Sequence, residues 1–378
     1  MEHVLNLLQH YALPFVIVIS VVVFVHEFGH YWVARRCGIK IETFSIGFGR
    51  EIFGWTDKHG TRWKISWLPL GGYVRMYGDG SPASTPGKTV HDMTDEQKKI
   101  AFFHQHVNKR MAVVVAGPAS NYIFAILVLT ALFIFNGQPF TPPEASGIVE
   151  GSAAAKAGLE PGDRILSADG ESVGRFEDIK RIVALNAGTP IAIEIERGGK
   201  QLHFAMTPDI VTVTDNFGGE HKLGRIGITS DKIEYRKLLP LEAAQQAVIE
   251  SWNLTAGTLK AVGQMIMGLR GTEELGGPLR IGEMAGNVAK DGPEALIWFM
   301  AVISINLGLI NLFPVPLLDG GHLAFYLAER LRGRPISERL QGLGANIGFA
   351  MVLSLMVFAT WNDLVHLKVI SYLRGLFS

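Results

Sequence analysis

Residues 21–30 read VVVFVHEFGH, and this stretch decides how the rest of the chain is interpreted. It places a His-Glu-x-x-His pattern at the end of an apolar run, and residues 11–25 carry no charge. Residues i and i+4 of a helix share a face, so His26 and His30 can offer two imidazoles to one Zn²⁺. Glu27 is then placed to accept a proton from a metal-bound water. The pattern therefore predicts a zinc site at membrane depth.

The composition favours a membrane protein. The 378 residues are 48% hydrophobic and 19% charged, with a mean hydropathy of +0.23, whereas soluble domains carry about 25% charged residues. The formal net charge of +0 gives no support for a nucleic-acid partner. The single cysteine, Cys37, excludes an internal disulfide and a cysteine-rich zinc site. The first residues, Met1-Glu2-His3, are not a basic region, so we expect no cleaved signal peptide.

Four segments are apolar enough to span a bilayer, which requires about 20 residues. They are 11–34, 111–135, 295–313 and 343–361. Basic residues cluster beside these spans, at Arg35, Arg36, Lys109, Arg110, Arg330, Arg332, Arg334 and Arg339. By the positive-inside rule those positions face the cytoplasm, and both termini and residues 136–294 face the outer side. The expected fold class is a polytopic α-helical membrane protein with about four transmembrane helices.

The expected cytoplasmic loop, 37–109, contains strand patterns. From Arg62 to Trp67, polar and apolar residues alternate with the period of two that a half-buried strand shows. Pro69 and Gly71-Gly72 then turn the chain back. We expect a small membrane-associated β-sheet here. It either covers the site as a surface hairpin or offers an edge that pairs with an extended substrate segment.

One compact outer module is expected between 145 and 208. Residues 152–159 predict a short helix ended by glycine, 176–185 a second helix and 190–196 an alternating strand. With its stretch AGLEPGDRI, the module resembles a PDZ domain of the bacterial protease type. Such a domain takes an extended peptide as an added strand. The alternative is a spacer that only blocks access.

A polar segment, 209–235, is expected to be a linker, and the apolar residues of 241–269 recur at helical spacing. That helix lies along the outer membrane surface or packs on the spans. The expected domains are a first transmembrane helix over 1–36, the cytoplasmic loop with its sheet over 37–109, a second transmembrane helix over 110–136, the PDZ domain over 137–212, the linker and amphipathic helix over 213–293, and the last two transmembrane helices over 294–378.

A catalytic zinc site needs a third protein ligand, and residues 311–322, NLFPVPLLDGGH, offer the best candidate in Asp319. Pro314 and Pro316 must end the apolar third span just before it. A broken helix at membrane depth is tolerated only where it is buried in protein or lines a cavity. Asn311 adds a polar group to the span, and such groups are functional candidates by default.

The charges of this set suit a medium of low dielectric constant. Zn²⁺ with neutral His26 and His30 and ionised Glu27 and Asp319 sums to zero, which is easier to bury than an isolated dication. Two alternatives stay open. His322 is a competing ligand or a polar residue at a helix start, and Asp319 is a ligand or a helix N-cap.

These paired motifs resemble the site-2 protease family, and within it the bacterial regulator-of-sigma-E type. The resemblance rests on HEFGH at 26–30 and NLFPVPLLDG at 311–320, with GPASN at 117–121 and GGYV at 71–74. It covers nearly the whole chain. One departure is that the best-known members carry two tandem PDZ domains, whereas one clear copy is found here. Residues 224–228 could be a remnant that closes a module.

The resemblance implies a role for each matching residue. His26, His30 and Asp319 would ligate zinc, and Glu27 would be the general base and acid. Asn311 would help to hold substrate near the metal, and the glycine-rich sheet would clamp an extended substrate segment. The expected substrate-binding residues are Asn311, Pro314, Pro316, Gly71 and Gly72.

The sequence thus predicts an intramembrane zinc metalloprotease that cleaves membrane proteins in or near their transmembrane helices. The resemblance implies a multi-pass protein of the bacterial inner membrane, with the active site toward the cytoplasm and the PDZ domain in the periplasm. Its substrate would be an anti-sigma factor already trimmed by another protease, or a leftover signal peptide; the lipid bilayer is its other partner. The alternatives are a non-catalytic membrane PDZ adaptor with a structural metal site, and a metal transporter.

Overall fold

The computed structural model describes residues 8–80, 92–214, 220–269, 271 and 276–366, so the predicted loop, the predicted linker and the chain ends lie partly outside the described residues. The chain divides into two compact units. The first contains Met1–Ala131, Ala244–Val262 and Gly271–Ser378, and the second contains Leu132–Ala243 and Gly263–Arg270.

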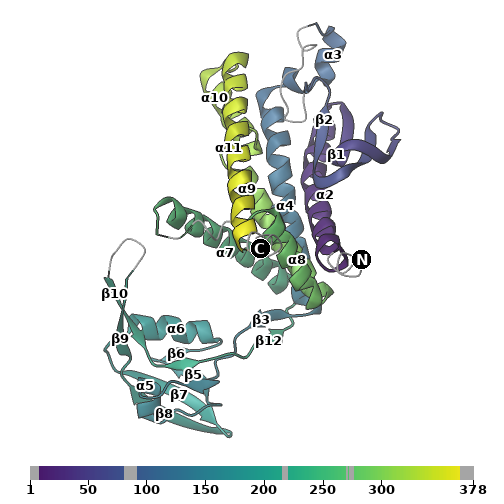
Figure 1. The fold of residues 1–378 in the computed structure, drawn as a ribbon. Coiled ribbons are helices and arrows are strands. Elements are labelled where there is room, and N and C mark those ends of the chain that lie inside the picture. The colour runs from purple at the N-terminus through teal and green to yellow at the C-terminus, as the bar shows by residue number, and fades with distance from the viewer. Residues whose placement is uncertain (1–7, 81–91, 215–219, 270, 272–275, 367–378) are drawn as a thin grey trace, which may run out of the picture. The chain divides into compact units, whose positions relative to one another are not determined.

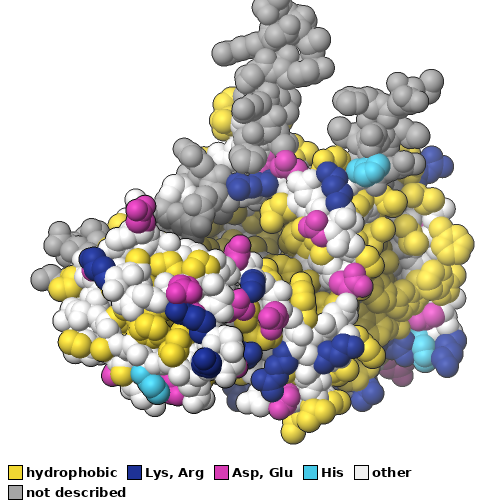
Figure 2. Space-filling view, turned by 90° about the horizontal axis from the view of Figure 1, so that it is seen from below, with side chains coloured by type: hydrophobic (Ala, Val, Ile, Leu, Met, Phe, Trp, Pro, Cys, Tyr) yellow, Lys and Arg dark blue, Asp and Glu magenta, His cyan; other side chains and the backbone are white. Residues whose placement is uncertain are grey.

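Four helices among the described residues are long and apolar enough to cross a membrane. They are α2 (Leu13–Arg36), which follows a π-helical turn η1 (Leu8–Ala12), α4 (Val107–Phe135), α9 (Pro293–Asn311) and α11 (Glu338–His366) (Figure 1). Their bounds lie close to those of the four predicted spans. Apolar side chains of α11 such as Phe349 and Val357 are exposed, and Figure 2 shows broad hydrophobic areas on the molecular surface. Length and composition therefore agree with an integral membrane protein.

A sheet of β1 (Ile41–Thr56) and β2 (Arg62–Met76) packs on α2. Residues 41–46 of β1 pair with both 62–65 and 72–76, so β2 folds back across β1 as predicted. Gly71 lies in this fold-back with φ +137°, a conformation that favours glycine. Phe44 is buried in a core shared with α2 and α4. Two short helices, α3 (Asp95–Ile100) and η3 (Phe102–His104), precede α4.

Three further helices are α7 (Pro240–Ile266), α8 (Pro278–Lys290) and α10 (Asp319–Arg332). The Thr255 hydroxyl of α7 lies 3.1 Å from the Tyr122 hydroxyl of α4, and Thr258 donates to Asn306 Oδ1 of α9 at 2.9 Å. Of the two positions predicted for the amphipathic helix, packing on the spans is therefore the one observed.

The sequence did not predict α8. Its interior contains Gly282 and Gly286, which weaken helix propensity. Asp363 of α11 stabilises its first turn by accepting hydrogen bonds from the backbone N–H groups of Gly277 and Leu279 at 2.8 and 3.0 Å. A tertiary contact thus supplies the cap that the local sequence lacks.

The second unit contains a four-stranded sheet in the order β6-β5-β7-β8. Its elements are α5 (Ala153–Ala157), β5 (Arg164–Ala168), β6 (Glu171–Ser172), α6 (Phe176–Leu185), β7 (Ile191–Arg197) and β8 (Lys200–Met206). Ile165, Ile179 and Ile193 are buried in one core. α5 ends at Gly158, whose φ is +86°. These elements occur in the predicted order.

The prediction of a polar linker is wrong. Those residues form β9 (Asp209–Thr214), β10 (Glu220–Arg225), β11 (Ile228–Thr229) and β12 (Glu234–Arg236). β11 pairs with β4 (Gly147–Ile148) and β12 pairs with β3 (Gln138–Phe140), so the module continues past residue 212 and includes 224–228. β11 and β12, with two and three residues, are too short to show the alternation on which the prediction depended, and the longer β9 and β10 pair with each other.

Candidate metal centre

The two histidines of α2 point their Nε2 atoms toward each other. His26 and His30 are 7% and 8% exposed, and their Nε2 atoms lie 3.2 Å apart. α2 is helical throughout this stretch, so the four-residue spacing puts both side chains on one face, as predicted. Both lie within the candidate span His10–Arg36.

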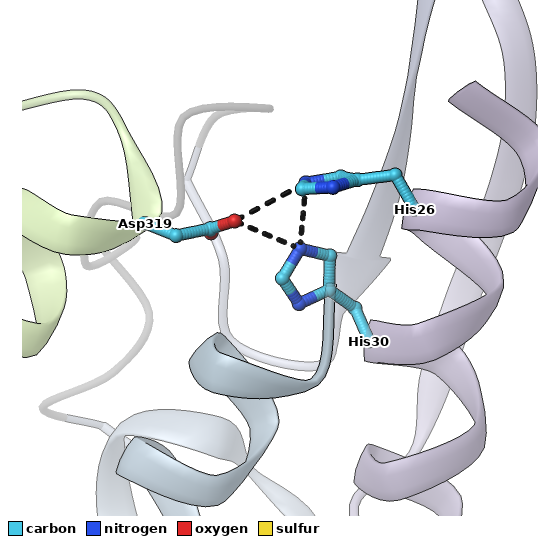
Figure 3. A group of neighbouring side chains, drawn as sticks. All are labelled: His26, His30 and Asp319. Carbon is cyan, nitrogen blue, oxygen red and sulfur yellow. Dashed lines mark hydrogen bonds and ion pairs between the residues drawn. The ribbon is translucent and has the colours of Figure 1, made fainter. Parts of the chain in front are cut away.

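Asp319 reaches the same place from a segment far along the chain (Figure 3). Its Oδ2 lies 3.1 Å from Nε2 of His26 and 3.4 Å from Nε2 of His30. Leu318 takes the N-cap position of α10, so the Asp319 carboxylate does not cap the helix. Oδ2 is buried and has no hydrogen-bond partner among the described residues.

These distances fit a tetrahedral Zn²⁺. Ligand atoms bound about 2.0–2.1 Å from zinc are about 3.3–3.4 Å from one another, and the three here are 3.1, 3.2 and 3.4 Å apart. A shared cation also accounts for a buried carboxylate oxygen that faces two imidazole nitrogens. Within the described part of the chain, the group able to hold a metal is His26, His30 and Asp319, without His322.

Small residues allow α4 to approach the histidines closely. A Cβ at Gly117 would lie 2.3 Å from Nε2 of His30 and 3.0 Å from Cε1 of His26. A Cβ at Gly29 would lie 2.3 Å from the Ala116 carbonyl oxygen, so α2 and α4 cross in backbone contact. The missing side chains leave room for the ligand cluster.

The connection from α9 to α10 is compact and strained. Leu317 has φ +85°, which costs a non-glycine residue about 1–3 kcal/mol. A Cβ at Gly320 would lie 2.3 Å from the Leu312 carbonyl oxygen, and one at Gly321 would lie 2.4 Å from that of Val315. The two glycines after Asp319 therefore let the start of α10 fold onto the preceding backbone.

Each imidazole is oriented through its other nitrogen. Nδ1 of His30 donates to the Val113 carbonyl oxygen at 2.8 Å, and Nδ1 of His26 lies 3.1 Å from Nδ2 of Asn121. When Nε2 of His26 presents its lone pair to a metal, Nδ1 carries the proton, and the amide must turn its oxygen toward the ring. That turn gives Asn121 Oδ1 the partner it lacks among the described residues.

A cavity of about 200 Å³ opens on the ligand cluster. Its lining includes Glu27, and also Gly72 and Asn311 from the predicted substrate-binding set. The Glu27 carboxylate faces the backbone N–H of Val74. A Cβ at Gly72 would lie 2.8 Å from Cγ1 of Val23 and 3.2 Å from Cγ of Glu27, so glycine lets β2 lie against α2. The cavity therefore joins the predicted base, the ligand cluster and the end of β2.

The other predicted substrate-binding residues are not among those that line this cavity. At Gly71 a Cβ would lie 2.5 Å from Cε2 of Phe48, in the fold-back of β2. Pro314 and Pro316 lie in the α9–α10 connection, and a Cβ at Gly348 of α11 would lie 1.9 Å from the Pro316 carbonyl oxygen. The structure gives these three residues a role in shaping the backbone.

Several residues around the cluster were not predicted as site residues, and His322 was considered only as a competing ligand. Asn121 is fully buried in the apolar helix α4, a signal by which it could have been found. Val113 acts through its carbonyl oxygen, which no side-chain pattern reports. His322 and Tyr326 line the cavity from α10, where they lie on the turns that follow Asp319.

A zinc-binding His-Glu-x-x-His helix within an apolar bundle is typical of a membrane zinc metalloprotease, and comparison with known proteins agrees. The chain belongs to peptidase family M50, whose model matches residues 14–355. A predicted zinc metalloprotease of Agrobacterium fabrum is 44% identical over 368 residues, which cover 95% of this chain and 97% of that protein. Metalloprotease MmpA of Caulobacter vibrioides is 38% identical over 387 residues, which cover 96% and 97%. The predicted family and zinc cofactor are confirmed.

One solved structure is also similar to part of the chain. It is the crystal structure of the PDZ domain of an SdrC-like protein from Listeria monocytogenes. The match covers 24% of this chain and 90% of that one, with 19% identity and a TM-score of 0.19. A likeness at this score supports no assignment of fold.

Proposed function

We propose that this protein cleaves peptide bonds within or beside the transmembrane helices of other membrane proteins. The observation that carries the proposal is that His26, His30, Asp319 and Glu27 line one cavity, with both histidines on a candidate span. A protease centre on a helix of that kind meets its substrate at membrane depth. A substrate helix must unwind locally there, because helical backbone hides its carbonyl groups.

The three clustered side chains hold the metal, and Glu27 moves the proton. A bound Zn²⁺ would polarise the scissile carbonyl group and lower the pKa of a coordinated water. Glu27 accepts the proton of the attacking water on its carboxylate and then donates it to the leaving amine. The Val74 N–H faces that carboxylate from β2. His26 and His30 would stay neutral as ligands, because the Val113 carbonyl oxygen accepts the Nδ1 proton of His30 and the Asn121 amide, once turned, accepts that of His26.

Residues 72–76 of β2 are the segment along which an unwound substrate strand would bind. They pair with β1 through one side, and Gly72, Tyr73, Val74 and Met76 line the cavity. A strand edge beside a cavity suits the addition of an extended peptide. Asn311 lines the same cavity from the end of α9 and would contact the substrate from a second helix. Gly71, Pro314 and Pro316 would support this cleft through the backbone.

The basic residues beside the spans support an orientation in which the catalytic end of the bundle would lie at the cytoplasmic face of a bacterial inner membrane, by the positive-inside rule. The second unit would then lie in the periplasm as a PDZ-like module. There it would admit membrane proteins whose outer part has already been removed. An anti-sigma factor and leftover signal peptides are substrates of that form.

Substitution Glu27→Gln tests the proposal. We expect the variant to bind one zinc per chain with unchanged affinity but to lose nearly all cleavage, because an amide cannot accept the water proton. Quantitative proteomics of membranes should then show single-span proteins accumulating uncut. If the protein were a membrane adaptor with a structural metal, Glu27→Gln would leave its function intact. That outcome would refute the proposed protease activity.

A further inference from the structure

α10 carries Asp319 as its first residue, so the position of the whole helix sets where that carboxylate points. The segment before it is non-helical and contains Leu317 in a strained conformation. A strained conformation persists only where the surrounding structure enforces it. The contacts farther along α10 are therefore important for the ligand at its start.

One of these contacts is a largely buried ion pair between Glu329 of α10 and Arg110 of α4. The two side chains are 13% and 10% exposed. The Arg110 guanidinium also lies 4.7 Å from the centre of the Tyr326 ring, and its Nε donates to the Gln105 carbonyl oxygen at 3.1 Å. One buried cation thus joins α10, α4 and the segment before α4.

α4 is also the helix that orients the two histidine ligands. Val113, about one turn after Arg110, accepts the Nδ1 proton of His30, and Asn121 faces Nδ1 of His26. We propose that the Arg110–Glu329 ion pair is a positioning device for the third ligand, holding α10 on α4 where Asp319 meets both imidazoles. This inference rests on the proposed role of Asp319 as a ligand.

Physical chemistry favours a positioning role over a purely stabilising one. Removing two charges from water offsets most of the attraction between them, so a buried ion pair adds little net stability. The planar guanidinium fork, in contrast, donates in fixed directions, here through Nη2 to Glu329 and through Nε to the Gln105 carbonyl oxygen. An arginine placed between a carboxylate and an aromatic ring therefore fixes how two helices meet.

A double-mutant cycle on the full-length protein tests the proposal. Zinc affinity is measured by chelator competition for the native protein, Glu329→Gln, Asp319→Asn and the double variant. We expect Glu329→Gln to weaken zinc binding about 10- to 100-fold, the usual effect of losing a supporting group. In the Asp319→Asn background the same change should alter zinc affinity by no more than about twofold. Equal weakening in both backgrounds would show a general loss of structure and overturn the inference.

Two further variants separate the possible results. Arg330 of α10 bonds to Asn108 at the surface, so Arg330→Gln is a matched control on the same helix and should keep native zinc affinity. Arg110→Lys keeps the charge but loses the fork, and it provides a second cycle if Glu329→Gln does not fold. If Glu329→Gln binds zinc with native affinity, the positioning role of the ion pair is wrong, but the proposed function is not affected. Native affinity in Asp319→Asn refutes the proposed metal ligand as well.

Discussion

Gly117 has no side chain at the point where α4 meets the two imidazoles. In Gly117→Ala, a Cβ would lie 2.3 Å from Nε2 of His30, closer than atoms can approach. We expect a loss of zinc binding of at least about 10-fold, with α4 intact, because alanine favours a helix over glycine by about 1 kcal/mol. Zinc titration with circular dichroism checks both.

Gly257 in α7 provides the matched control. A Cβ there would meet nothing within 4 Å, so Gly257→Ala should bind zinc as the native protein does. If Gly117→Ala also binds zinc normally, the close approach of α4 to the cluster is wrong.

Asn121 supports His26 through one hydrogen bond, so its replacement should act on the metal rather than on the fold. Asn121→Leu is expected to weaken zinc binding by about 10-fold, because the imidazole loses the acceptor that fixes its tautomer. Asn121→Asp keeps an acceptor oxygen and should retain zinc. Chelator competition distinguishes the two, and a weaker aspartate variant would argue against a carbonyl oxygen facing the ring.

Around the metal centre, the sequence predicts which side chains act as ligands or base, but it does not predict which backbone positions support them. His26, Glu27 and His30 follow from helical spacing, and Asp319 follows from prolines that end an apolar span. Spacing within one helix is local information. Gly117 and Val113 act through a missing side chain and a carbonyl oxygen, and their roles exist only once α4 packs on α2.

At the scale of elements, Asp163 and Arg197 join the turn before β5 to the end of β7. Arg197 donates to both Asp163 carboxylate oxygens at 2.7 Å, and Asp163 also accepts the Glu160 N–H at 2.8 Å. Burial alone would raise the pKa of Asp163, but these hydrogen bonds outweigh it and hold the pKa below its ordinary value.

The second unit should therefore lose stability in acid. A lowered pKa in the folded state means that the contribution is complete above the unfolded pKa of 3.8 and disappears as pH falls through the folded value. We expect Asp163→Asn to lower the free energy of unfolding by about 2 kcal/mol at neutral pH. The variant should also lose less stability than the native protein as the pH falls. Denaturation curves at several pH values measure the free energy of unfolding. If the variant and the native protein lose the same stability in acid, the prediction is wrong.

Elements that depend on distant partners were the ones that the sequence missed. The four spans are long apolar runs, and α6 and α7 carry apolar residues at helical spacing, so their presence could be predicted. β11 and β12 are short and exist because β4 and β3 lie beside them. α8 needs Asp363 from α11 for its first turn. Strand pairing and helix capping by residues far away in the chain leave no pattern in the local sequence.

At the scale of the whole molecule, β3 and β12 bring the two ends of the module together. Phe140 pairs with Glu234 and Gln138 with Arg236, so residues 141–233 can be replaced by a two-residue Asn-Gly turn. If the module selects substrates, the shortened protein should cut membrane proteins whose outer part is intact. Zinc stoichiometry should not change. Cleavage assays with long and trimmed substrates measure the difference.

The shortened protein carrying Glu27→Gln is the control, since it should cut neither substrate. If the shortened active protein still distinguishes long from trimmed substrates, selection does not reside in residues 141–233. The proposed cleavage chemistry would survive that result.

The distance along the chain between the metal ligands has a consequence for how the cell makes this protein. Asp319 is synthesised roughly 290 residues after His30. At about 5–20 residues per second, the ribosome needs on the order of 15–60 s to bridge that interval. Until then the nascent chain carries two imidazoles without the third ligand. If Asp319 is the third zinc ligand, the protease is inert while its first helices enter the membrane, and it becomes active only after residue 319 has been added.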